Sequence, residues 1–189
     1  MTNSTISNPA IDQFIVASEQ VIIADPEMMP SKHKGIPMFL QRPMALITLL
    51  VLSPMLMIVM FLLRLESRGS CFFSQDRIGK YGRHFKMYKF RSMYLKTDRR
   101  YAEPDPSTSD RDGICKKYRN DSRISIVGAF IRKYSIDELP QLINIVKGDM
   151  ALIGPRPALA IEVNAYPTSA LCRLNGIPGL SGLWQVSGR

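Results

Sequence analysis

The sequence predicts an α+β protein attached to a membrane, with one apolar helix followed by a small, mainly helical domain. Three observations support this fold class. Residues 44–63 are almost entirely apolar, as in a helix that contacts lipid. Gly79 and Gly82 mark turns ahead of residues 85–93, which we interpret as extended chain. Residues 135–150 carry apolar side chains at helical spacing.

Composition limits the classes of function. The 189 residues suffice for one ordinary domain with an attached segment, and the formal net charge of +9 favours an anionic partner: a membrane surface, a nucleic acid or a phosphorylated substrate. Three widely spaced cysteines and two distant histidines match no zinc or disulfide pattern, which indicates reduced thiols facing a cytosol. Residues 1–42 predict a tail with a short surface helix around residues 11–23, without the features of a secretory signal.

The apolar segment, residues 43–64, is long enough to span a hydrocarbon core, which takes roughly 20 helical residues. Ser53 and Pro54 interrupt it near the middle, where proline removes one hydrogen bond and serine can satisfy a freed carbonyl. Two geometries stay open on these residues: a kinked spanning helix, or a re-entrant helix-break-helix that returns to the same face. Basic residues flank both ends, so the positive-inside rule favours neither end, as expected if both are cytoplasmic. These residues are Lys32, Lys34, Arg42, Arg64 and Arg68.

A basic stretch follows the apolar segment. If residues 85–93 are extended, Lys89 and Arg91 share one face and could grip a diphosphate, the arginine through a bidentate fork and the lysine as a point charge. An equally simple interpretation places this face against anionic lipid headgroups. Nucleic-acid binding is discounted, because no nucleic-acid motif is present and a basic patch beside a membrane segment already has a partner. Residues 95–122 are polar and rich in turn formers, which predicts a surface loop.

Two adjacent acids, Asp137 and Glu138, stand at the start of the last predicted helix. Pro140 is tolerated only within about the first four positions of a helix, so the helix begins near residues 136–138 and the acids lie in or beside its first turn. Gly148 is the predicted stop. Taken locally, the simpler interpretation is that Asp137 is an N-cap. Because a helix N-terminus also favours phosphate, the rest of the chain must decide.

Arginines accompany the acids. Arg132 comes five residues before Asp137, near enough to add positive charge if the chain turns between them. Arg156 lies between the prolines of IGPRP, which hold it on a stiff stretch suited to gripping phosphate, although the motif alone is better explained as a tight turn with a solvated arginine. The closely spaced glycines around Trp184, in GIPGLSGLWQVSGR, allow either backbone contact with a ligand or ordinary turns.

Taken together, these segments resemble the monotopic phosphoglycosyltransferases, bacterial sugar transferases that are also called polyprenyl-phosphate sugar-1-phosphate transferases. The family's order is matched by the apolar segment with Ser53-Pro54, then SQDRIGKYGRHFKMYKFRSM, NDSRISIVGAFIRKYSIDELPQLINIVKGDMALIGPRP and IPGLSGLWQVSGR. These elements cover residues 43–189 apart from the polar loop. A DELPQL or GPRP taken singly is a weak signal, whereas the whole set in order is specific.

The resemblance implies an activity and roles for residues. Family members transfer a sugar 1-phosphate from a UDP-sugar to undecaprenyl phosphate, with magnesium (Mg²⁺), at the cytoplasmic face of the bacterial inner membrane, and so initiate a lipid-linked glycan. Asp137 matches the nucleophile that forms a phosphosugar–aspartyl intermediate, and Glu138 matches its metal-linked partner. The family's substrate-binding basic positions fall on Lys89, Arg91, Arg132 and Arg156.

The resemblance also implies an organisation: a tail over residues 1–42, a re-entrant membrane helix over residues 43–64, and a cytoplasmic catalytic domain over residues 65–189. Expected partners are a UDP-sugar, undecaprenyl phosphate and membrane lipids, with no nucleic acid and with a homodimer as the assembly to test. Relatives continue beyond the final SGR, so a truncated or shortened C-terminus is expected. The alternative is a catalytically idle, membrane-anchored module that binds UDP-sugar or acts as a scaffold; the intact Asp137-Glu138 pair favours the enzyme.

Overall fold

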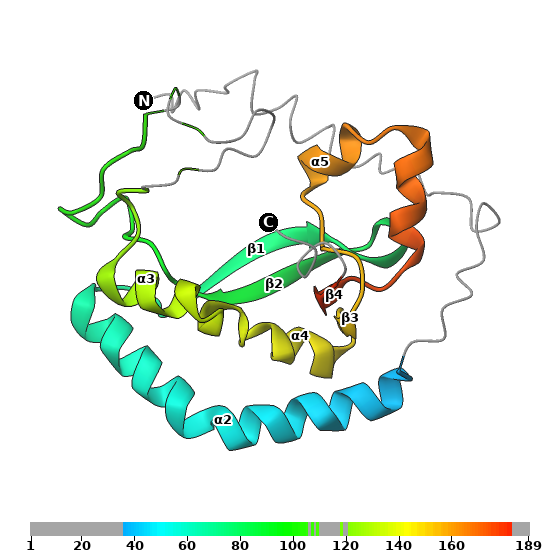
Figure 1. The fold of residues 1–189 in the computed structure, drawn as a ribbon, viewed down its shortest axis with the longest axis horizontal. Helices are drawn as coiled ribbons and strands as arrows, with labels where there is room; N and C mark the ends of the chain where they lie inside the picture. The colour runs from blue at the N-terminus through cyan, green and yellow to red at the C-terminus, as the bar shows by residue number, and fades with distance from the viewer. Residues whose placement is uncertain (1–35, 106, 108, 110–117, 119–120, 183–189) are drawn as a thin grey trace, which may run out of the picture.

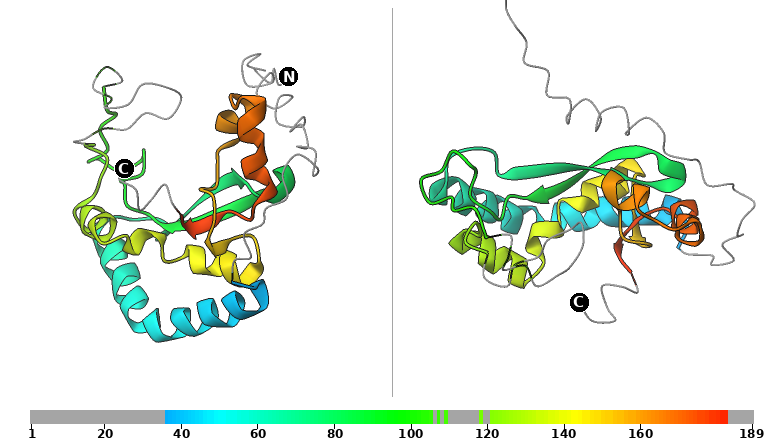
Figure 2. Two further views of the ribbon diagram at one scale, coloured as in Figure 1. Left: turned by 45° about the vertical axis from the view of Figure 1, so that its right-hand side comes forward. Right: turned by 90° about the horizontal axis from the view of Figure 1, so that it is seen from above.

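A two-stranded hairpin, a short helix and a long bent helix lie in layers, one above the other (Figure 1). The computed structural model describes residues 36–105, 107, 109, 118 and 121–182. The hairpin pairs β1 (Phe72–Ile78) with β2 (His84–Phe90), the short helix is α4 (Gln141–Lys147), and the long helix is α2 (Met38–Glu66). The left-hand view of Figure 2, turned by 45° about the vertical axis, shows the same order of layers. The mixture of helices and strands confirms the α+β class.

α2 is a single helix of 29 residues, and it is the one helix in the described part of the chain that is long and apolar enough to cross a membrane. It extends beyond both ends of the predicted segment 43–64. Gln41 explains the extension at the N-terminal end, because it is buried and its amide oxygen accepts a hydrogen bond from the backbone N–H of Leu152 at 2.7 Å. The surface helix predicted around residues 11–23 lies outside the described residues.

Ser53 and Pro54 mark the middle of α2. Pro54 has no N–H to donate to the carbonyl of Leu50, four residues earlier. The Ser53 hydroxyl donates to that carbonyl oxygen at 2.7 Å, as the sequence predicts. Figure 1 shows the helix changing direction along its length, with both ends turned toward the rest of the protein. The predicted helix-break-helix is therefore a bend within one continuous helix and not a gap between two helices.

The two ends of α2 pack on different hydrophobic clusters, while its middle is exposed. Ala45 packs with apolar residues of α4 and β2, whereas Leu63 packs with Phe90 in a second cluster. Between them, Leu50 and Val51 are 65% and 71% exposed. Soluble monomeric proteins rarely expose a long contiguous apolar surface, so α2 has the properties of a membrane anchor.

The β1–β2 hairpin confirms the predicted turn, and it confirms the predicted extended chain as far as Phe90. Its register runs without a break from Phe72↔Phe90 to Ile78↔His84. At the tip, η2 (Lys80–Gly82) holds Tyr81 and Gly82 at positive φ, a conformation that glycine adopts without strain. β2 ends at Phe90, so Arg91 lies just beyond the strand. The predicted loop 95–122 contains hydrogen-bonded turns at residues 95–101 and is otherwise described only in part.

A chain reversal connects α3 (Ile126–Lys133) to the acid pair. Ser135 adopts a left-handed conformation, with φ of 56°, and turns the chain into the 3₁₀ helix η4 (Ile136–Glu138). α4 then begins at Gln141, later than predicted, because η4 and a turn take up the residues before it. Gly148, with φ of 90°, ends α4 and confirms the predicted stop.

The last part of the described chain folds back on the hairpin. β3 (Ala151–Ile153) and β4 (Gly179–Ser181) pair in parallel, and α5 (Ala160–Asn164) and η5 (Thr168–Asn175) come between them in the chain. A third hydrophobic cluster joins this part to β1 through Ile78, Ala158, Val163 and Leu174. Trp184 and the last glycine of the sequence lie outside the described residues.

Candidate active site

The acid pair lies on η4, the turn between α3 and α4. Asp137 and Glu138 are both partly buried. Over this described stretch no side-chain hydrogen bond caps the N-terminus of η4 or of α4, and the capping positions belong to Ser135 and Pro140. The local interpretation of Asp137 as an N-cap is therefore wrong, and both carboxylates are left for other contacts.

Lys89 of β2 contacts the acid pair directly. Its Nζ donates a hydrogen bond to Oε1 of Glu138 at 2.7 Å, and the two side chains are 26% and 27% exposed. The contact arises because the end of β2 packs against η4. The structure thus brings Lys89 and the acids together from separate sequence motifs, at a depth where solvent still reaches the ion pair.

The pKa of the Asp137 carboxyl is raised. Burial is the largest cause, because it penalises the charged form, and Glu138 adds a like charge. The positive charges of Lys89 and Arg132 oppose this shift, so the chain does turn enough for Arg132 to act on Asp137. Within the described residues, the carboxylate of Asp137 accepts a hydrogen bond only from its own backbone N–H. A desolvated and weakly paired carboxyl is typical of functional sites.

Asn144, a fully buried residue of α4, fixes the strand beside the acid pair, and sequence reasoning missed it. Its Oδ1 accepts a hydrogen bond from the N–H of Tyr88 at 3.1 Å, and its Nδ2 donates to the carbonyl of Lys86 at 2.7 Å. β2 is thereby held on α4 at the residue that precedes Lys89. The signal in the sequence that could have identified Asn144 is that it is a polar residue among the apolar residues of QLINIVK. A buried amide must find hydrogen-bond partners.

Arg91 takes a different place from the one predicted for it. It is buried, and its guanidinium donates to the backbone carbonyls of Leu63 (3.3 Å), Ser67 (2.7 Å) and Arg68 (2.9 Å). The carbonyls at the end of a helix lack some of their partners within the helix, and Arg91 supplies donors to them at the end of α2. The carbonyl of Leu63 also accepts a hydrogen bond from the N–H of Ser67 at 3.2 Å. Arg91 therefore does not form a diphosphate grip with Lys89 here, because its donors are committed to these backbone oxygens.

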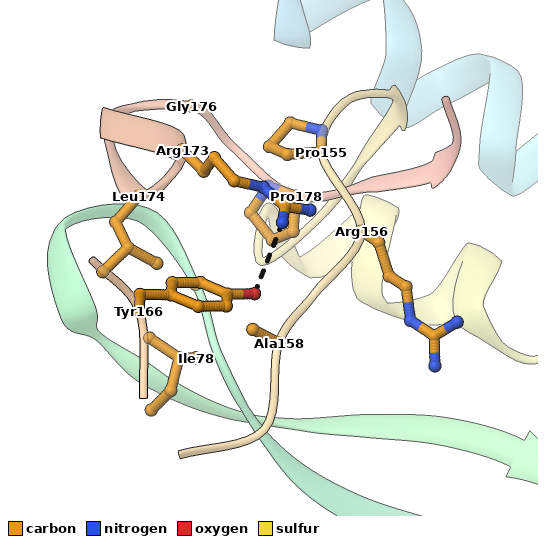
Figure 3. Close-up of a pocket in the computed structure, with 10 residues that line it drawn as sticks. Ile78, Pro155, Arg156, Ala158, Tyr166, Arg173, Leu174, Gly176 and Pro178 are labelled. Atoms are coloured by element: carbon orange, nitrogen blue, oxygen red, sulfur yellow. Dashed lines mark hydrogen bonds between the residues drawn. The ribbon is translucent and has the colours of Figure 1, made fainter. Parts of the chain in front are cut away.

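Arg156 belongs to a different segment from the acid pair. It is exposed between β3 and α5, and Figure 3 shows it extending away from the neighbouring Arg173 and Tyr166. Those two side chains contact each other, with the Arg173 guanidinium donating to the Tyr166 hydroxyl at 3.5 Å. Of the predicted site residues, the structure gathers Lys89, Arg132 and the two acids, and leaves Arg156 on the adjoining loop.

The segment that carries Arg156 is stiff, as the flanking prolines predict. The N–H of Gly154 donates to the carbonyl of Ser181, and the N–H of Gly179 donates to the carbonyl of Pro155, both at 2.9 Å. A side chain on Gly154 or Gly179 would collide with the facing backbone, so both positions require glycine. The arginine is thus presented from an ordered stretch of chain.

The acid pair can take part in a magnesium site together with a substrate. The described residues include no group of three or more His, Cys, Asp or Glu side chains that could hold a metal ion by themselves. Mg²⁺ commonly takes one or two protein carboxylates and completes its shell with water and substrate phosphates. The carboxylates of Asp137 and Glu138 fit that pattern.

Comparison with known proteins gives the chain its family. The family described as Bacterial sugar transferase matches residues 34–189. The exopolysaccharide production protein ExoY of Rhizobium meliloti is 41% identical over 148 residues, which make up 77% of this chain and 66% of that protein.

Two longer relatives carry functional names. The undecaprenyl-phosphate galactose phosphotransferase of Salmonella typhimurium is 41% identical over 146 residues, 76% of this chain and 31% of that protein. The undecaprenyl-phosphate glucose phosphotransferase of Komagataeibacter xylinus is 43% identical over 150 residues, 76% of this chain and 26% of that protein. The chain therefore spans less than a third of the length of these two relatives. The family match includes α2, the hairpin and the acid pair, and the chain belongs to the bacterial sugar transferase family.

Proposed function

We propose that the protein transfers a sugar 1-phosphate from a UDP-sugar to undecaprenyl phosphate through a covalent intermediate on Asp137, and so initiates a lipid-linked glycan. The observation that carries this proposal is the desolvated Asp137 carboxyl beside the Lys89–Glu138 ion pair. Family membership supports the substrate classes, since two relatives are named as undecaprenyl-phosphate phosphotransferases of galactose and glucose.

The reaction has two displacements at one phosphorus. First, a carboxylate oxygen of Asp137 attacks the phosphorus that bears the sugar. The new O–P bond forms as the bond to the bridging oxygen breaks, and UMP leaves with the bonding electron pair. Second, an oxygen of undecaprenyl phosphate attacks the same phosphorus, and the Asp137 carboxylate is released. Each step is simpler than a direct transfer between two polyanions.

The cations around the acid pair suit this chemistry, because phosphoryl transfer depends mainly on positioning and charge stabilisation. Lys89 lies at 2.7 Å from Glu138, and the charge of Arg132 acts on Asp137. We assign Arg156, on its stiff and exposed segment, to the phosphates of the donor. Glu138 would hold Mg²⁺ together with the substrate phosphates, and the ion would supply further positive charge at the diphosphate. Arg91 is left out of this set, since it completes the end of α2.

We also propose that α2 is a re-entrant anchor at the cytoplasmic face of the bacterial inner membrane. Its two ends, at Ala45 and Leu63, both pack on the one domain that carries the acid pair. Ends on opposite sides of a bilayer would be separated by a hydrocarbon core of about 30 Å. The bend of α2 (Figure 1), the Ser53-Pro54 pair within the helix and its exposed middle fit a hairpin-like entry into one leaflet. Such an anchor holds the lipid phosphate and the soluble donor at one interface.

The covalent step can be tested with the full chain, a UDP-sugar and magnesium, without a lipid acceptor. The wild-type protein should release UMP in one stoichiometric burst, and mass spectrometry at low temperature should find the sugar phosphate on the peptide that contains Asp137. Asp137→Asn should show neither, since it retains the size of the side chain and loses the nucleophile. Asp149→Asn, which removes a carboxylate from just beyond α4, is the matched control and should form the adduct. An adduct on another residue would refute the assignment.

The same assay separates the enzyme from the idle binding module. Binding of UDP-sugar without UMP release, even after undecaprenyl phosphate is added, would favour the idle module. A panel of UDP-sugars assayed for UMP release would identify the sugar. The predicted homodimer stays a prediction, which the mass of the detergent-solubilised protein would check.

Topology calls for an independent experiment in intact cells. Single cysteines at positions 34 and 68, in a background without the native cysteines, should be labelled only from the cytoplasmic side. Pro54→Leu restores a backbone N–H to the helix, so it should shift part of the population toward a spanning helix. Periplasmic labelling of either position in the unaltered helix would contradict a re-entrant anchor.

A further inference from the structure

The C-terminal end of α2 carries a second charged region, apart from the acid pair. A hollow of about 440 Å³ opens there, between the last turn of α2 and the turn over residues 97–100. The residues that line it are Leu65, Glu66, Ser67, Arg68, Thr97, Asp98, Arg99 and Arg100. This set holds three arginines and two acids, so its effect on a ligand depends on which of these charges already have partners.

Both acids are engaged in holding the fold together. Asp98 accepts hydrogen bonds from the Ser67 hydroxyl at 2.8 Å and from Nη2 of Arg100 at 3.0 Å. Glu66 accepts a hydrogen bond at 2.7 Å from the N–H of Ile126, at the start of α3. Arg100 is engaged as well, since it also donates to the carbonyl of Glu66. The negative charges of the hollow therefore have their own donors.

Two arginines of the hollow remain available. Arg68 and Arg99 are exposed, and within the part of the chain that the structure describes neither guanidinium has an ion-pair or hydrogen-bond partner. Their backbones are ordered nonetheless. The carbonyl of Arg68 accepts from Arg91 at 2.9 Å, and Arg99 lies in a turn closed by the N–H of Tyr101 and the carbonyl of Asp98 at 3.0 Å. Two cations in the lining of one hollow are thus presented from fixed backbone.

The position of the hollow at the end of the apolar helix identifies the class of ligand. Leu65, in the last turn of α2, is 67% exposed and lines the same hollow as the two arginines. An apolar side chain beside two guanidinium groups matches a group with an acyl chain on one side and a phosphate on the other. We propose that Arg68 and Arg99 bind the phosphate of an anionic phospholipid headgroup. The proposal rests on α2 as a membrane anchor and not on the chemistry of Asp137.

The test uses the full chain in nanodiscs of phosphatidylcholine and phosphatidylglycerol, with native mass spectrometry of the lipids that stay bound. The wild-type protein should retain phosphatidylglycerol in preference to phosphatidylcholine. Each basic residue near an anionic membrane surface contributes about a fivefold change in affinity, so the double variant Arg68→Gln/Arg99→Gln should lose roughly thirtyfold of this preference. The matched control, Lys80→Gln/Arg83→Gln, removes the same charge from the hairpin tip and should keep the preference.

Three outcomes would overturn the proposal. They are an unchanged preference in the Arg68/Arg99 variant, an equal loss in the control, and displacement of phosphatidylglycerol by inorganic phosphate alone, which would indicate a site for a soluble anion. An unchanged melting temperature shows that the double variant is folded; if it is not, Arg99→Gln alone serves the same comparison. The double variant should still form the adduct on Asp137, so failure of the lipid site and failure of the proposed reaction are separately visible.

Discussion

Two aspartates, one structural and one that we propose as the nucleophile, differ in what surrounds their carboxyl groups. Asp98, in the turn over residues 97–100 beside the end of α2, accepts hydrogen bonds from Arg100 and Ser67. These bonds hold the pKa of its carboxyl well below the usual range. Asp137, on η4, is raised in pKa chiefly by burial, although Lys89 lies close by. A nearby cation does not distinguish the two acids, since both have one. The difference is that Asp98 is hydrogen-bonded by its cation and Asp137 is only near its own.

The largest effect should come from exchanging these two carboxylates for amides. Asp137→Asn should lower steady-state UMP release by at least on the order of a thousandfold, because it removes the attacking atom. Asp98→Asn should retain most of the activity per folded molecule. It should instead weaken the contact between the end of α2 and the turn over residues 97–100. Activity and melting temperature of both variants, measured in the same detergent, check the pair. Equal loss of activity in both would mean that the two acids do not differ in kind.

Lys89 and Arg91 allow the same comparison for cations. Arg91→Met removes the buried guanidinium that donates to the carbonyls of Leu63, Ser67 and Arg68, so it should lower the free energy of unfolding by about 2–4 kcal/mol. Lys89→Met should cost much less stability, since the ion pair with Glu138 is partly exposed. It should nonetheless lower UMP release by roughly a hundredfold, because a positive charge beside the acids is lost. Denaturant unfolding and initial rates check both variants. A stable but inactive Arg91→Met would instead favour the prediction that Lys89 and Arg91 bind a diphosphate together.

Local signals in the sequence predicted much of this architecture. Gly148 stops α4 and the glycines at the hairpin tip mark its turn, because each constrains the backbone directly. Pro54 lies within α2, which bends along its length (Figure 1). The acid pair was found by its charge at a helix start. The parallel pairing of β3 and β4 was not foreseen, since it depends on close approach of backbones at Gly154 and Gly179, which lie far apart in the chain.

Roles that depend on tertiary partners were beyond the sequence. Lys89 and Arg91 have the same charge, lie two positions apart and were expected on one face, yet one contacts Glu138 and the other contacts the end of α2. Their separation follows from the end of β2 at Phe90 and from three carbonyls that only the folded chain brings within reach of Arg91. Asn144 was missed for the same reason, because its partners are backbone groups of β2.

The raised pKa of Asp137 predicts a pH dependence of the first step. In the proposed reaction only the carboxylate form of Asp137 attacks phosphorus, so the UMP burst should fall as pH drops through this pKa, at a higher pH than for an ordinary aspartate. Lys89→Met removes a positive charge that lowers the pKa of Asp137. The acidic limb of the profile of UMP burst against pH should therefore move to higher pH in this variant. Arg132→Met should move the limb in the same direction by less. Burst amplitude and rate against pH check this, with Arg83→Gln as the control. A limb that moves to lower pH in Lys89→Met would contradict the electrostatic account.

The smallest predicted effect concerns stability, and its sign differs between the two aspartates. For Asp137 the folded protein holds the proton more tightly than the unfolded chain, so this group's contribution to stability is complete below the unfolded pKa and is lost as pH rises through the folded pKa. For Asp98 the folded pKa is lowered, so its contribution is present above the unfolded pKa and is lost as pH falls through the folded pKa. Asp137→Asn should therefore raise the melting temperature slightly at neutral pH, through an increase of less than about 1 kcal/mol in the free energy of unfolding. Asp98→Asn should lower it there, and the two variants should converge as the solution is acidified. Melting temperatures from neutral to acidic pH check this, and a destabilised Asp137→Asn at neutral pH would mean that its carboxylate supports the fold after all.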